Sequence, residues 1–285
     1  MNNMNKKEIQ LILDELGIRP NKKLGQNFLI DKNVVSKVIS ESQILENEVI
    51  LEIGSGLGAL TEDLVKLKNN IYAYEIDFRL YHYLKEKFSE YENLELINED
   101  ILNAEIPPHD VVISNIPYSL TGPIFDKVFY KERPPRGILI IENSIAERIF
   151  SKNIYKKFSR ISVTFNAFME PVKKYKISRL TFIPIPNIEL ALIIIKPRED
   201  IDQFLIIEKQ RNFFLRFVAG LMPYKNKNLI NALSLFLKRE DKSHFSKIDI
   251  SNFIKSTNFA NQKIAQFNVD EIIELSKAIY ALLYH

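Results

Sequence analysis

Short apolar runs alternate with helical patterns over the first half of the chain. Five of these runs consist mostly of aliphatic and aromatic residues, as strands buried on both faces of a sheet do: residues 49–53, 71–74, 94–97, 111–114 and 138–141. In the intervening segments, apolar residues recur at three- and four-residue spacing, which predicts helices over residues 60–67, 79–88, 123–130 and 145–150. The alternation predicts an α/β fold with a Rossmann-like, doubly wound and mostly parallel sheet.

Two further apolar runs, residues 161–168 and 188–195, come without a comparable helix between them. We predict that they form an antiparallel hairpin that completes the sheet. Its connection would carry the basic stretch 173–179 and the proline-rich segment 182–186.

The character of the chain changes after residues 196–200, where a proline and several charges interrupt the apolar alternation. Helical periodicity follows over residues 204–221, 227–237, 248–256 and 269–283. We therefore predict two domains: a larger one over residues 1–198, which carries the candidate chemistry, and a small all-α domain over residues 199–285.

Composition argues against a secreted or membrane-inserted protein. The 285 residues include no cysteine, and no apolar run approaches the ~18 residues of a membrane helix. Asn, Lys and Glu dominate residues 1–10, unlike a signal peptide. We expect a cytoplasmic monomer that has no membrane partner.

The net charge is only +3, but the basic residues are clustered. Each cluster taken alone is equally consistent with a solvated surface, whereas together they favour a polyanionic partner. The clusters are Lys22 and Lys23; Lys152, Lys156, Lys157 and Arg160; Lys173, Lys174, Lys176 and Arg179; and Lys225 and Lys227.

A glycine-rich turn follows the first predicted strand. Gly54, Gly56 and Gly58 come directly after Glu52 and Ile53 and precede a predicted helix. Missing side chains in such a turn let a ligand approach backbone N–H groups. The G-x-G-x-G spacing differs from the G-x-G-x-x-G of dinucleotide-binding folds and is similar to that of S-adenosylmethionine-dependent methyltransferases.

Acidic residues follow the next two predicted strands. Glu75 lies where a carboxylate can accept hydrogen bonds from both ribose hydroxyls, although it could be a surface acid and Asp77 could compete for the role. Asp100 is placed to bind an adenine amine, and its alternative is a helix-capping or loop acid.

The segment Asn115-Ile116-Pro117-Tyr118 ends the fourth predicted strand. An ordinary turn would account for Asn and Pro alone. A site for a flat base with an exocyclic amine accounts for all four residues. The Asn115 side chain and the Ile116 main chain offer carbonyl acceptors, Pro117 stiffens the turn, and Tyr118 offers a ring for stacking. Acceptors that stabilise charge developing on the amine make a His or Cys base unnecessary, and we predict no metal site.

These motifs occur in one order and resemble the KsgA-type ribosomal RNA adenine dimethyltransferases. The resemblance rests on residues 24–29, Glu52 to Thr61, Glu75 to Asp77, Asn115 to Tyr118 and the Phe182-x-Pro184-x-Pro186 motif. Residues 224–233 and the last segment look like the archaeal and eukaryotic branch.

The resemblance implies S-adenosylmethionine as the cofactor. It also implies dimethylation of two adjacent adenosines near the 3′ end of small-subunit rRNA, in an immature small subunit. The implied catalytic residues are Asn115, Ile116, Pro117, Tyr118 and Phe182, with Phe182 sandwiching the flipped target base against Tyr118. The implied cofactor-binding residues are Gln26, Asn27, Leu29, Glu52, Gly54, Gly56, Glu75, Ile76, Asp100, Ile101 and Asn115. We expect Lys173, Lys174, Lys176, Arg179, Lys225 and Lys227 to contact RNA.

Two segments depart from the family's usual pattern. Glu142-Asn143-Ser144 stands in place of Gln-x-Glu, and Ile188-Glu189-Leu190 stands near the usual Val-Asp-Ser. These departures bear on how the substrate is positioned and on the dimethylation pattern. Two alternatives remain: the macrolide-resistance branch, which methylates large-subunit rRNA, and a non-catalytic rRNA-binding assembly factor on the same scaffold.

Overall fold

A computed structural model describes residues 6–20, 25–151, 158–242 and 244–284. The predictions for Lys22, Lys23, Lys152, Lys156 and Lys157 fall outside these ranges, and so does the first residue of the 24–29 motif.

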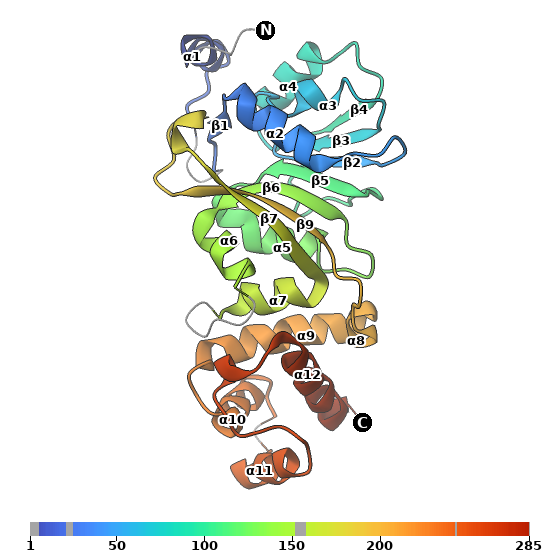
Figure 1. Ribbon diagram of the computed structural model, residues 1–285, viewed down its shortest axis with the longest axis vertical. Coiled ribbons are helices and arrows are strands. Elements are labelled where there is room, and N and C mark those ends of the chain that lie inside the picture. The colour runs from blue at the N-terminus through green and yellow to red at the C-terminus, as the bar shows by residue number, and fades with distance from the viewer. Residues whose placement is uncertain (1–5, 21–24, 152–157, 243, 285) are drawn as a thin grey trace. The chain divides into compact units, whose positions relative to one another are not determined.

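The centre of the fold is a seven-stranded sheet in the order β4-β3-β2-β5-β6-β9-β7 (Figure 1). β2 pairs in parallel with β3 and β5, β3 with β4, and β5 with β6, whereas β6 and β9 are antiparallel. The predicted doubly wound, mostly parallel sheet is therefore confirmed. Its strands are β2 (Ile50–Ile53), β3 (Ile71–Tyr74), β4 (Leu94–Ile97), β5 (Val111–Asn115), β6 (Arg136–Glu142), β7 (Met169–Ile177) and β9 (Leu190–Pro197).

The predicted hairpin is wrong in one arm. Residues 161–168 belong to helix α7 (Arg160–Phe168), and the strand beside β9 is β7. Ser159 and Ser162 form a reciprocal cap at the start of α7. Because α7 is buried almost all round, its apolar run reads like a buried strand, and periodicity cannot separate the two. The basic stretch is therefore largely in β7, not in a connection.

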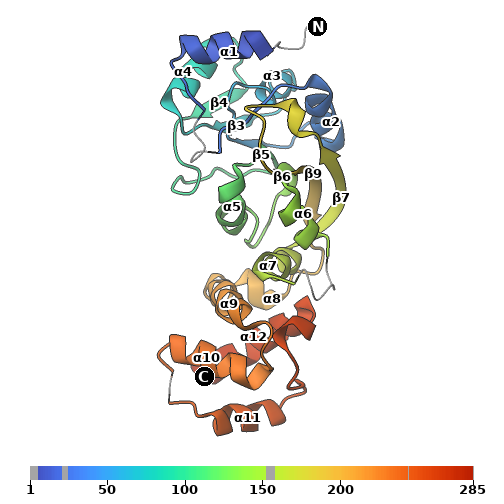
Figure 2. The same cartoon turned by 90° about the vertical axis from the view of Figure 1, so that its left-hand side faces the viewer.

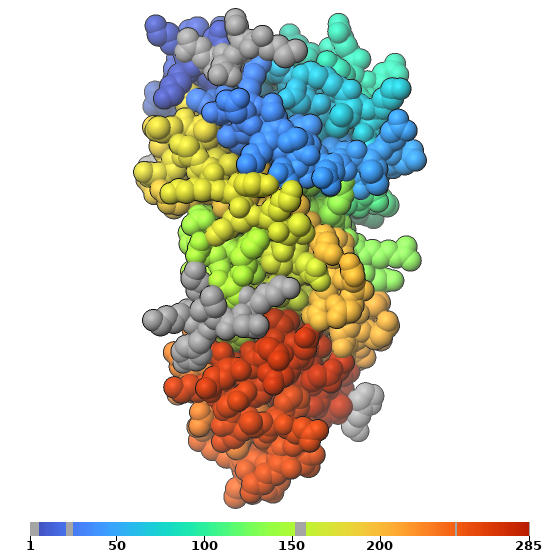
Figure 3. All heavy atoms as spheres, viewed as in Figure 1, coloured from blue at the N-terminus to red at the C-terminus, as the bar shows by residue number. Residues whose placement is uncertain are grey.

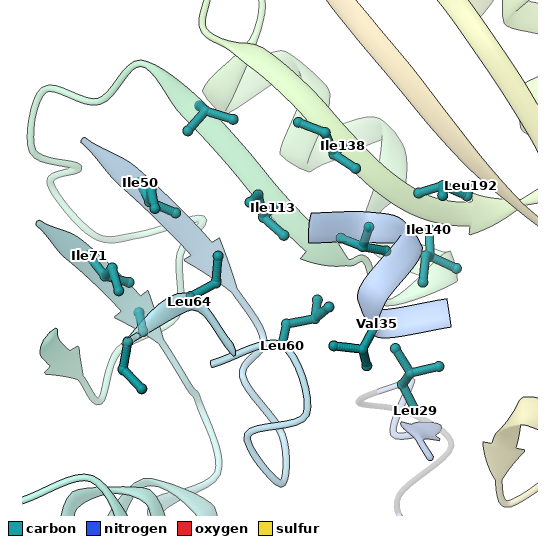
Figure 4. Close-up of a cluster of buried hydrophobic side chains, with 14 of the residues drawn as sticks. Leu29, Val35, Ile50, Leu60, Leu64, Ile71, Ile113, Ile138, Ile140 and Leu192 are labelled. Atoms are coloured by element: carbon teal, nitrogen blue, oxygen red, sulfur yellow. The ribbon is translucent and has the colours of Figure 1, made fainter. Parts of the chain in front are cut away.

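Helices cover both faces of the sheet. In Figure 4, Val35 of α2 (Lys32–Ser42), together with Leu60 and Leu64, points toward side chains of β2, β5 and β6. On β6, a Cβ added at Gly137 would lie 3.1 Å from the Phe129 ring, so the end of α5 packs closely there. The helices of this part are α1 (Lys6–Glu15), α2, α3 (Thr61–Leu64), α4 (Phe78–Lys87), α5 (Thr121–Val128) and α6 (Asn143–Ile149).

The sequence patterns did not predict α1 or α2. A local signal for α2 exists at Asp31, whose carboxylate accepts hydrogen bonds from the backbone N–H of Asn33 at 2.8 Å and of Val34 at 3.3 Å. An acidic N-cap before an apolar pair is a usual helix start.

A small second sheet joins two segments that are far apart in the chain. Phe28 and Leu29 form β1, which pairs antiparallel with β8 (Phe182–Ile183). The backbone N–H of Ile30 also donates to the Thr181 carbonyl at 2.9 Å. The pairing holds the N-terminal motif next to the proline-rich motif, which no local pattern predicts.

The chain divides into two compact units. The first comprises residues 1–129, 134–146 and 171–197, and the second comprises 130–133, 147–170 and 198–285. The last segment of the second unit begins after Pro197, next to the predicted boundary. Helix α7, which precedes that boundary, also belongs to the second unit. In the second unit the Phe168 and Phe214 rings meet edge to face with centroids 6.3 Å apart.

The C-terminal helices are drawn in orange and red in Figure 2. They pack around aromatic side chains, among them Phe213, Phe217 and Phe236. Phe213, Phe217 and Phe236 are almost fully buried, and a Cβ at Gly220 would lie only 2.5 Å from the Phe236 ring, so α9 and α10 approach closely. The predicted first helix is interrupted by the extended backbone of Ile207. These helices are α8 (Gln203–Ile206), α9 (Glu208–Leu221), α10 (Leu229–Arg239), α11 (Lys247–Lys255) and α12 (Val269–Tyr284). No helix in the described ranges is both long and apolar enough to cross a membrane.

Candidate active site

The glycine-rich turn leaves β2 with its backbone in the left-handed region. The φ angles of Gly54, Gly56 and Gly58 are +74°, +58° and +82°, which other residues adopt at a cost. A Cβ at Gly54 would meet nothing within 4 Å, whereas one at Gly58 would lie 2.8 Å from the Phe88 ring. The turn is therefore open at Gly54 and packed at Gly58. Since α3 has only four residues, a helix dipole contributes little here. The backbone N–H groups of Gly54 and Gly58 donate to the carbonyls of Tyr74 and Ser55, both at 2.8 Å.

Glu75 shapes this turn from the end of β3. Its carboxylate accepts hydrogen bonds from the backbone N–H of Gly56 at 2.8 Å and of Asp77 at 2.9 Å. Burial raises the pKa of Glu75, since only 5% of the residue is exposed. A carboxylate has about four acceptor positions, so this geometry leaves acceptor capacity for ribose hydroxyls.

Gln26 reaches the same region through Asp77. The Gln26 amide donates to the Asp77 carboxylate at 3.1 Å, and the Arg79 guanidinium donates at 2.9 Å. Burial acts to raise the pKa of Asp77, but the hydrogen bonds from Arg79 and Gln26 outweigh it and lower the pKa. Gln26, predicted to bind the cofactor, therefore positions the loop after β3.

Glu52 lies beneath the glycine-rich turn within β2. The Thr61 hydroxyl donates to its carboxylate at 2.7 Å, and only 1% of the residue is exposed. Burial raises the pKa of Glu52 to about 7, although the Thr61 hydrogen bond favours the charged form. The group can thus gain or lose a proton near neutral pH.

Asp100 follows β4 and organises its own loop. Its carboxylate accepts from the Leu102 backbone N–H at 3.0 Å and from the Asn103 amide at 3.3 Å. This is the loop role that the sequence offered as the alternative, and the residue is partly exposed. Nearby, Ile76 is 48% exposed, whereas Ile101 is buried. Ile76 is therefore the residue of the two that presents an apolar surface to solvent.

Asn115 ends β5 with its amide fixed in one direction. The amide nitrogen donates to the Asn27 carbonyl at 3.0 Å, and the amide oxygen is buried without a hydrogen-bond partner. Buried acceptors of this kind are uncommon and call for an explanation. An unpaired acceptor suits a ligand that brings its own N–H donor.

The rest of this motif is tightly built. The Ile116 N–H donates to the Ile140 carbonyl at 3.0 Å, and the Leu120 N–H donates to the Pro117 carbonyl at 2.8 Å. Gly25 has φ +64°, and a Cβ there would lie 2.8 Å from the Pro117 Cβ, so the N-terminal segment packs directly on the motif. Burial raises the pKa of Tyr118, whose hydroxyl is buried and unpaired.

A cavity of about 520 Å³ lies at Tyr118, the last residue of this motif. Gly25, Gln26, Asn27, Tyr118, Ser119, Glu142 and residues 184–188 line it. The predicted partner of Tyr118 is not at this surface, because Phe182 is fully buried in the core through the β1–β8 pairing. Instead Ile185, which is 48% exposed, lies at the cavity. The structure thus places Phe182 in the core and Ile185, from the same proline-rich segment, at the cavity.

Comparison with known proteins adds an independent observation. The family model described as "Ribosomal RNA adenine dimethylase" matches residues 17–275. The chain belongs to this family. Its membership confirms the resemblance to KsgA-type enzymes and the methyltransferase class.

Individual relatives agree with this assignment. Ribosomal RNA small subunit methyltransferase A of Thermotoga neapolitana is 35% identical over 264 residues, with 92% of this chain and 93% of that protein covered. A probable ribosomal RNA small subunit methyltransferase A of Thermococcus sibiricus is 31% identical over 271 residues, covering 93% and 94%.

Solved structures share the fold. A dimethyladenosine transferase from Plasmodium falciparum superposes with a TM-score of 0.68 at 20% identity, covering 88% of this chain and 98% of that one. The 23S rRNA methyltransferase ErmE gives a TM-score of 0.59 at 22% identity, covering 89% and 100%.

In this family member, several of the predicted RNA-contacting cations are held by acids. Lys173 pairs with Glu41 at 3.0 Å, while Lys176 and Arg179 pair with Glu189 at 3.2 and 3.5 Å. Lys174 on β7 is exposed. In Figure 3 the yellow segment from β7 to β8 lies at the surface beside α2 in blue. The net positive charge at the surface of β7 is thus smaller than its sequence indicates, because acids from other segments offset part of it.

Lys225 and Lys227 have different surroundings. The Lys225 ammonium donates to the Phe158 carbonyl at 2.7 Å and is partly buried, whereas Lys227 is exposed. Lys225 therefore has a structural contact of its own. Lys227 is the better placed of the two for contact with a partner.

Proposed function

We propose that this protein transfers methyl groups from S-adenosylmethionine to the N6 amine of adenosines in small-subunit ribosomal RNA. The observation that carries the proposal is the buried, unpaired Asn115 oxygen, in the same motif as Tyr118, which lines a cavity. Family membership supports the same reaction, and the relatives named for the small subunit support that substrate. The resemblance extends the proposal to dimethylation of two adjacent adenosines near the 3′ end.

The proposed mechanism is electrostatic. The nitrogen lone pair of adenine is conjugated with the ring, so the amine is a weak nucleophile until it becomes tetrahedral. The Asn115 oxygen accepts an N–H of the amine, as we propose the Ile116 carbonyl also does, and these acceptors stabilise the positive charge that develops on nitrogen. Because the Asn27 carbonyl already fixes the Asn115 amide, little reorganisation is needed. Tyr118 stacks on the base.

The residues around the glycine-rich turn fit the cofactor. Gly54 is open to a ligand, and Glu75 keeps acceptor positions for ribose hydroxyls. S-adenosylmethionine supplies an electrophilic methyl group on a sulfonium centre. We propose that Ile76 covers one face of the adenine, that Asp100 binds its amine, and that Gln26, Asn27, Leu29, Glu52, Gly56 and Ile101 shape the site around them.

We also propose the finer setting. The protein is a cytoplasmic monomer that acts on an immature small subunit. Its C-terminal domain, residues 199–285, contributes to choosing the RNA, because this part carries exposed basic residues such as Lys227 and none of the cofactor motifs.

The test is to incubate the protein and labelled S-adenosylmethionine with immature small subunits and, separately, with immature large subunits. Mass spectrometry of the digested rRNA should find N6,N6-dimethyladenosine in the small subunit only, and far less of it with the Asn115→Ala protein after the same time. Methylation confined to the large subunit would favour the macrolide-resistance activity. Subunit binding without any methylation would favour an assembly factor.

A further inference from the structure

A second hollow adjoins the catalytic cavity. It has a volume of about 570 Å³ and is lined by Lys176, Ser178, Arg179, Leu180, Ile185 and Glu189. Ile185 lines both spaces, so an occupant of the second hollow would lie next to an occupant of the first. The resemblance and the sequence motifs assign no ligand to this hollow as a whole.

Two of its walls are apolar. Leu180 is 64% exposed and Ile185 is 48% exposed, although both are large aliphatic residues. Exposed aliphatic side chains that face a shared hollow can contact the flat surface of a base. An isolated exposed residue would carry no such meaning.

The charged wall leaves positive charge after internal pairing. Glu189 is shared between Lys176 and Arg179, so a single carboxylate faces two cations. The side chains of Lys176 and Arg179 are 78% and 43% exposed, and that of Glu189 is 50% exposed. Exposed pairs of this kind exchange partners easily, since they are worth little in water. A phosphate can therefore take the place of Glu189.

The backbone under the hollow is held in place. The Ser178 side chain accepts from the Leu180 N–H at 3.3 Å, and the Thr181 hydroxyl donates to the Ser178 carbonyl at 2.7 Å. Arg179 also donates to the Pro186 carbonyl at 3.4 Å, which links this turn to the proline-rich loop. The hollow is thus formed before any ligand binds, which lowers the ordering cost of binding.

We propose that this hollow binds the nucleotide next to the target adenosine in a single-stranded stretch of RNA. Its base contacts Leu180 and Ile185, and its phosphate binds Arg179 and Lys176 in place of Glu189. This proposal rests on the proposed function, which places the target adenosine in the adjoining cavity. The two spaces adjoin at Ile185, and this favours RNA as the occupant of the second hollow over an unconnected small ligand. Successive nucleotides of RNA are covalently joined, and each offers a base and a phosphate.

The test measures binding of a short fluorescent single-stranded RNA containing adjacent adenosines, by polarisation over a salt series. Arg179→Ala and Lys176→Ala should each weaken binding and reduce the log–log salt slope by about 0.7. Glu189→Gln should do the opposite and tighten binding, because it frees two cations. Leu180→Ala should weaken binding without changing the slope. Lys66→Ala is the matched control: its cation pairs with Asp63, lines neither space, and should have little effect.

A second arm locates the nucleotide. Removing the base next to the target adenosine should weaken binding to the parent protein, and by a smaller factor in the Leu180→Ala protein, since that variant has already lost the contact. Equal losses in both proteins would overturn the proposal. So would parental affinity for Glu189→Gln and Leu180→Ala, or a parent protein that fails to bind the RNA even at low salt.

Folding and function are followed separately. Thermal unfolding and S-adenosylmethionine affinity should be unchanged in these surface variants. If the parent methylates small subunits but the variants bind RNA as the parent does, only the hollow is misassigned. If the variants show the expected pattern but the parent methylates nothing, the hollow stands and the proposed function fails.

Discussion

At the scale of single residues, Asn115 and Tyr118 make separable contributions. Asn115→Ala removes the unpaired acceptor, so single-turnover methyl transfer should fall by roughly 10²–10³-fold, while S-adenosylmethionine affinity changes little. Tyr118→Phe is the informative partner variant. Because the Tyr118 hydroxyl is buried without a hydrogen bond, its removal should leave the rate near the parental value, whereas Tyr118→Ala should lose the stacking surface and slow the reaction. A parental rate for Asn115→Ala would contradict the mechanism.

Glu75 is expected to matter for the cofactor through two routes. Glu75→Ala would remove acceptors for the ribose and also release the N–H groups of Gly56 and Asp77 that shape the turn. Hydrogen bonds to charged groups contribute about 1.5–3 kcal/mol each, so cofactor affinity measured by calorimetry should drop by at least about tenfold. Glu75→Gln should retain part of it. Unchanged affinity in a folded Glu75→Ala protein would move the ribose role to another acid, with Asp77 next.

At the scale of elements, the turn before α10 contains two lysines with different roles. Lys225 makes a structural hydrogen bond, whereas Lys227 is exposed. Lys225→Ala removes a hydrogen bond to the Phe158 carbonyl and should lower the free energy of unfolding by about 1.5 kcal/mol, as measured in urea. Lys227→Ala should leave stability unchanged. If Lys227 contacts a phosphate, the same variant should reduce the salt slope of subunit binding by about one unit or less. Equal stabilities for the two variants would contradict the structural role of Lys225.

Elements also show where local patterns mislead. The sequence patterns predict a strand over residues 161–168 and a connection over residues 173–179, because the first segment is rich in apolar residues and the second carries several charges. The apolar run is a helix surrounded by core, and the charged segment is a strand at the edge of the sheet, where side chains on one face meet water.

At the scale of the whole molecule, Glu52 couples folding to pH. Its pKa in the folded protein is raised to about 7 by burial, above the ~4.3 of an exposed Glu. The folded state thus holds this proton more tightly. The stabilisation from it is complete below about pH 4.3 and is lost as pH rises through about 7, a change of ~4 kcal/mol.

The measurement is the free energy of unfolding between pH 5 and 8 for the parent and for Glu52→Gln, which is neutral throughout. As pH rises, the free energy of unfolding of the parent should fall relative to that of Glu52→Gln. A constant difference across this range would show that Glu52 is not the group responsible.

The sequence by itself determined the parts of this protein that depend on local pattern. Parallel strands appear as dense apolar runs, C-terminal helices as periodic ones, and the glycine-rich turn and the Asn115 motif as short segments whose residue types suit one chemistry. These features need only near neighbours, so the five strands predicted for the parallel sheet agree with the structure, and the family assignment agrees with the comparisons.

Only the tertiary structure decided which side chains meet. Pairing of β1 with β8 buries Phe182 and leaves Ile185 at the cavity, Gln26 reaches Asp77, and Glu41 and Glu189 take up cations that look free in the sequence. Each of these contacts joins segments that local periodicity treats separately. Burial and charge pairing depend on the folded chain. They decide which residues of a sequence motif are accessible to a substrate and which are not.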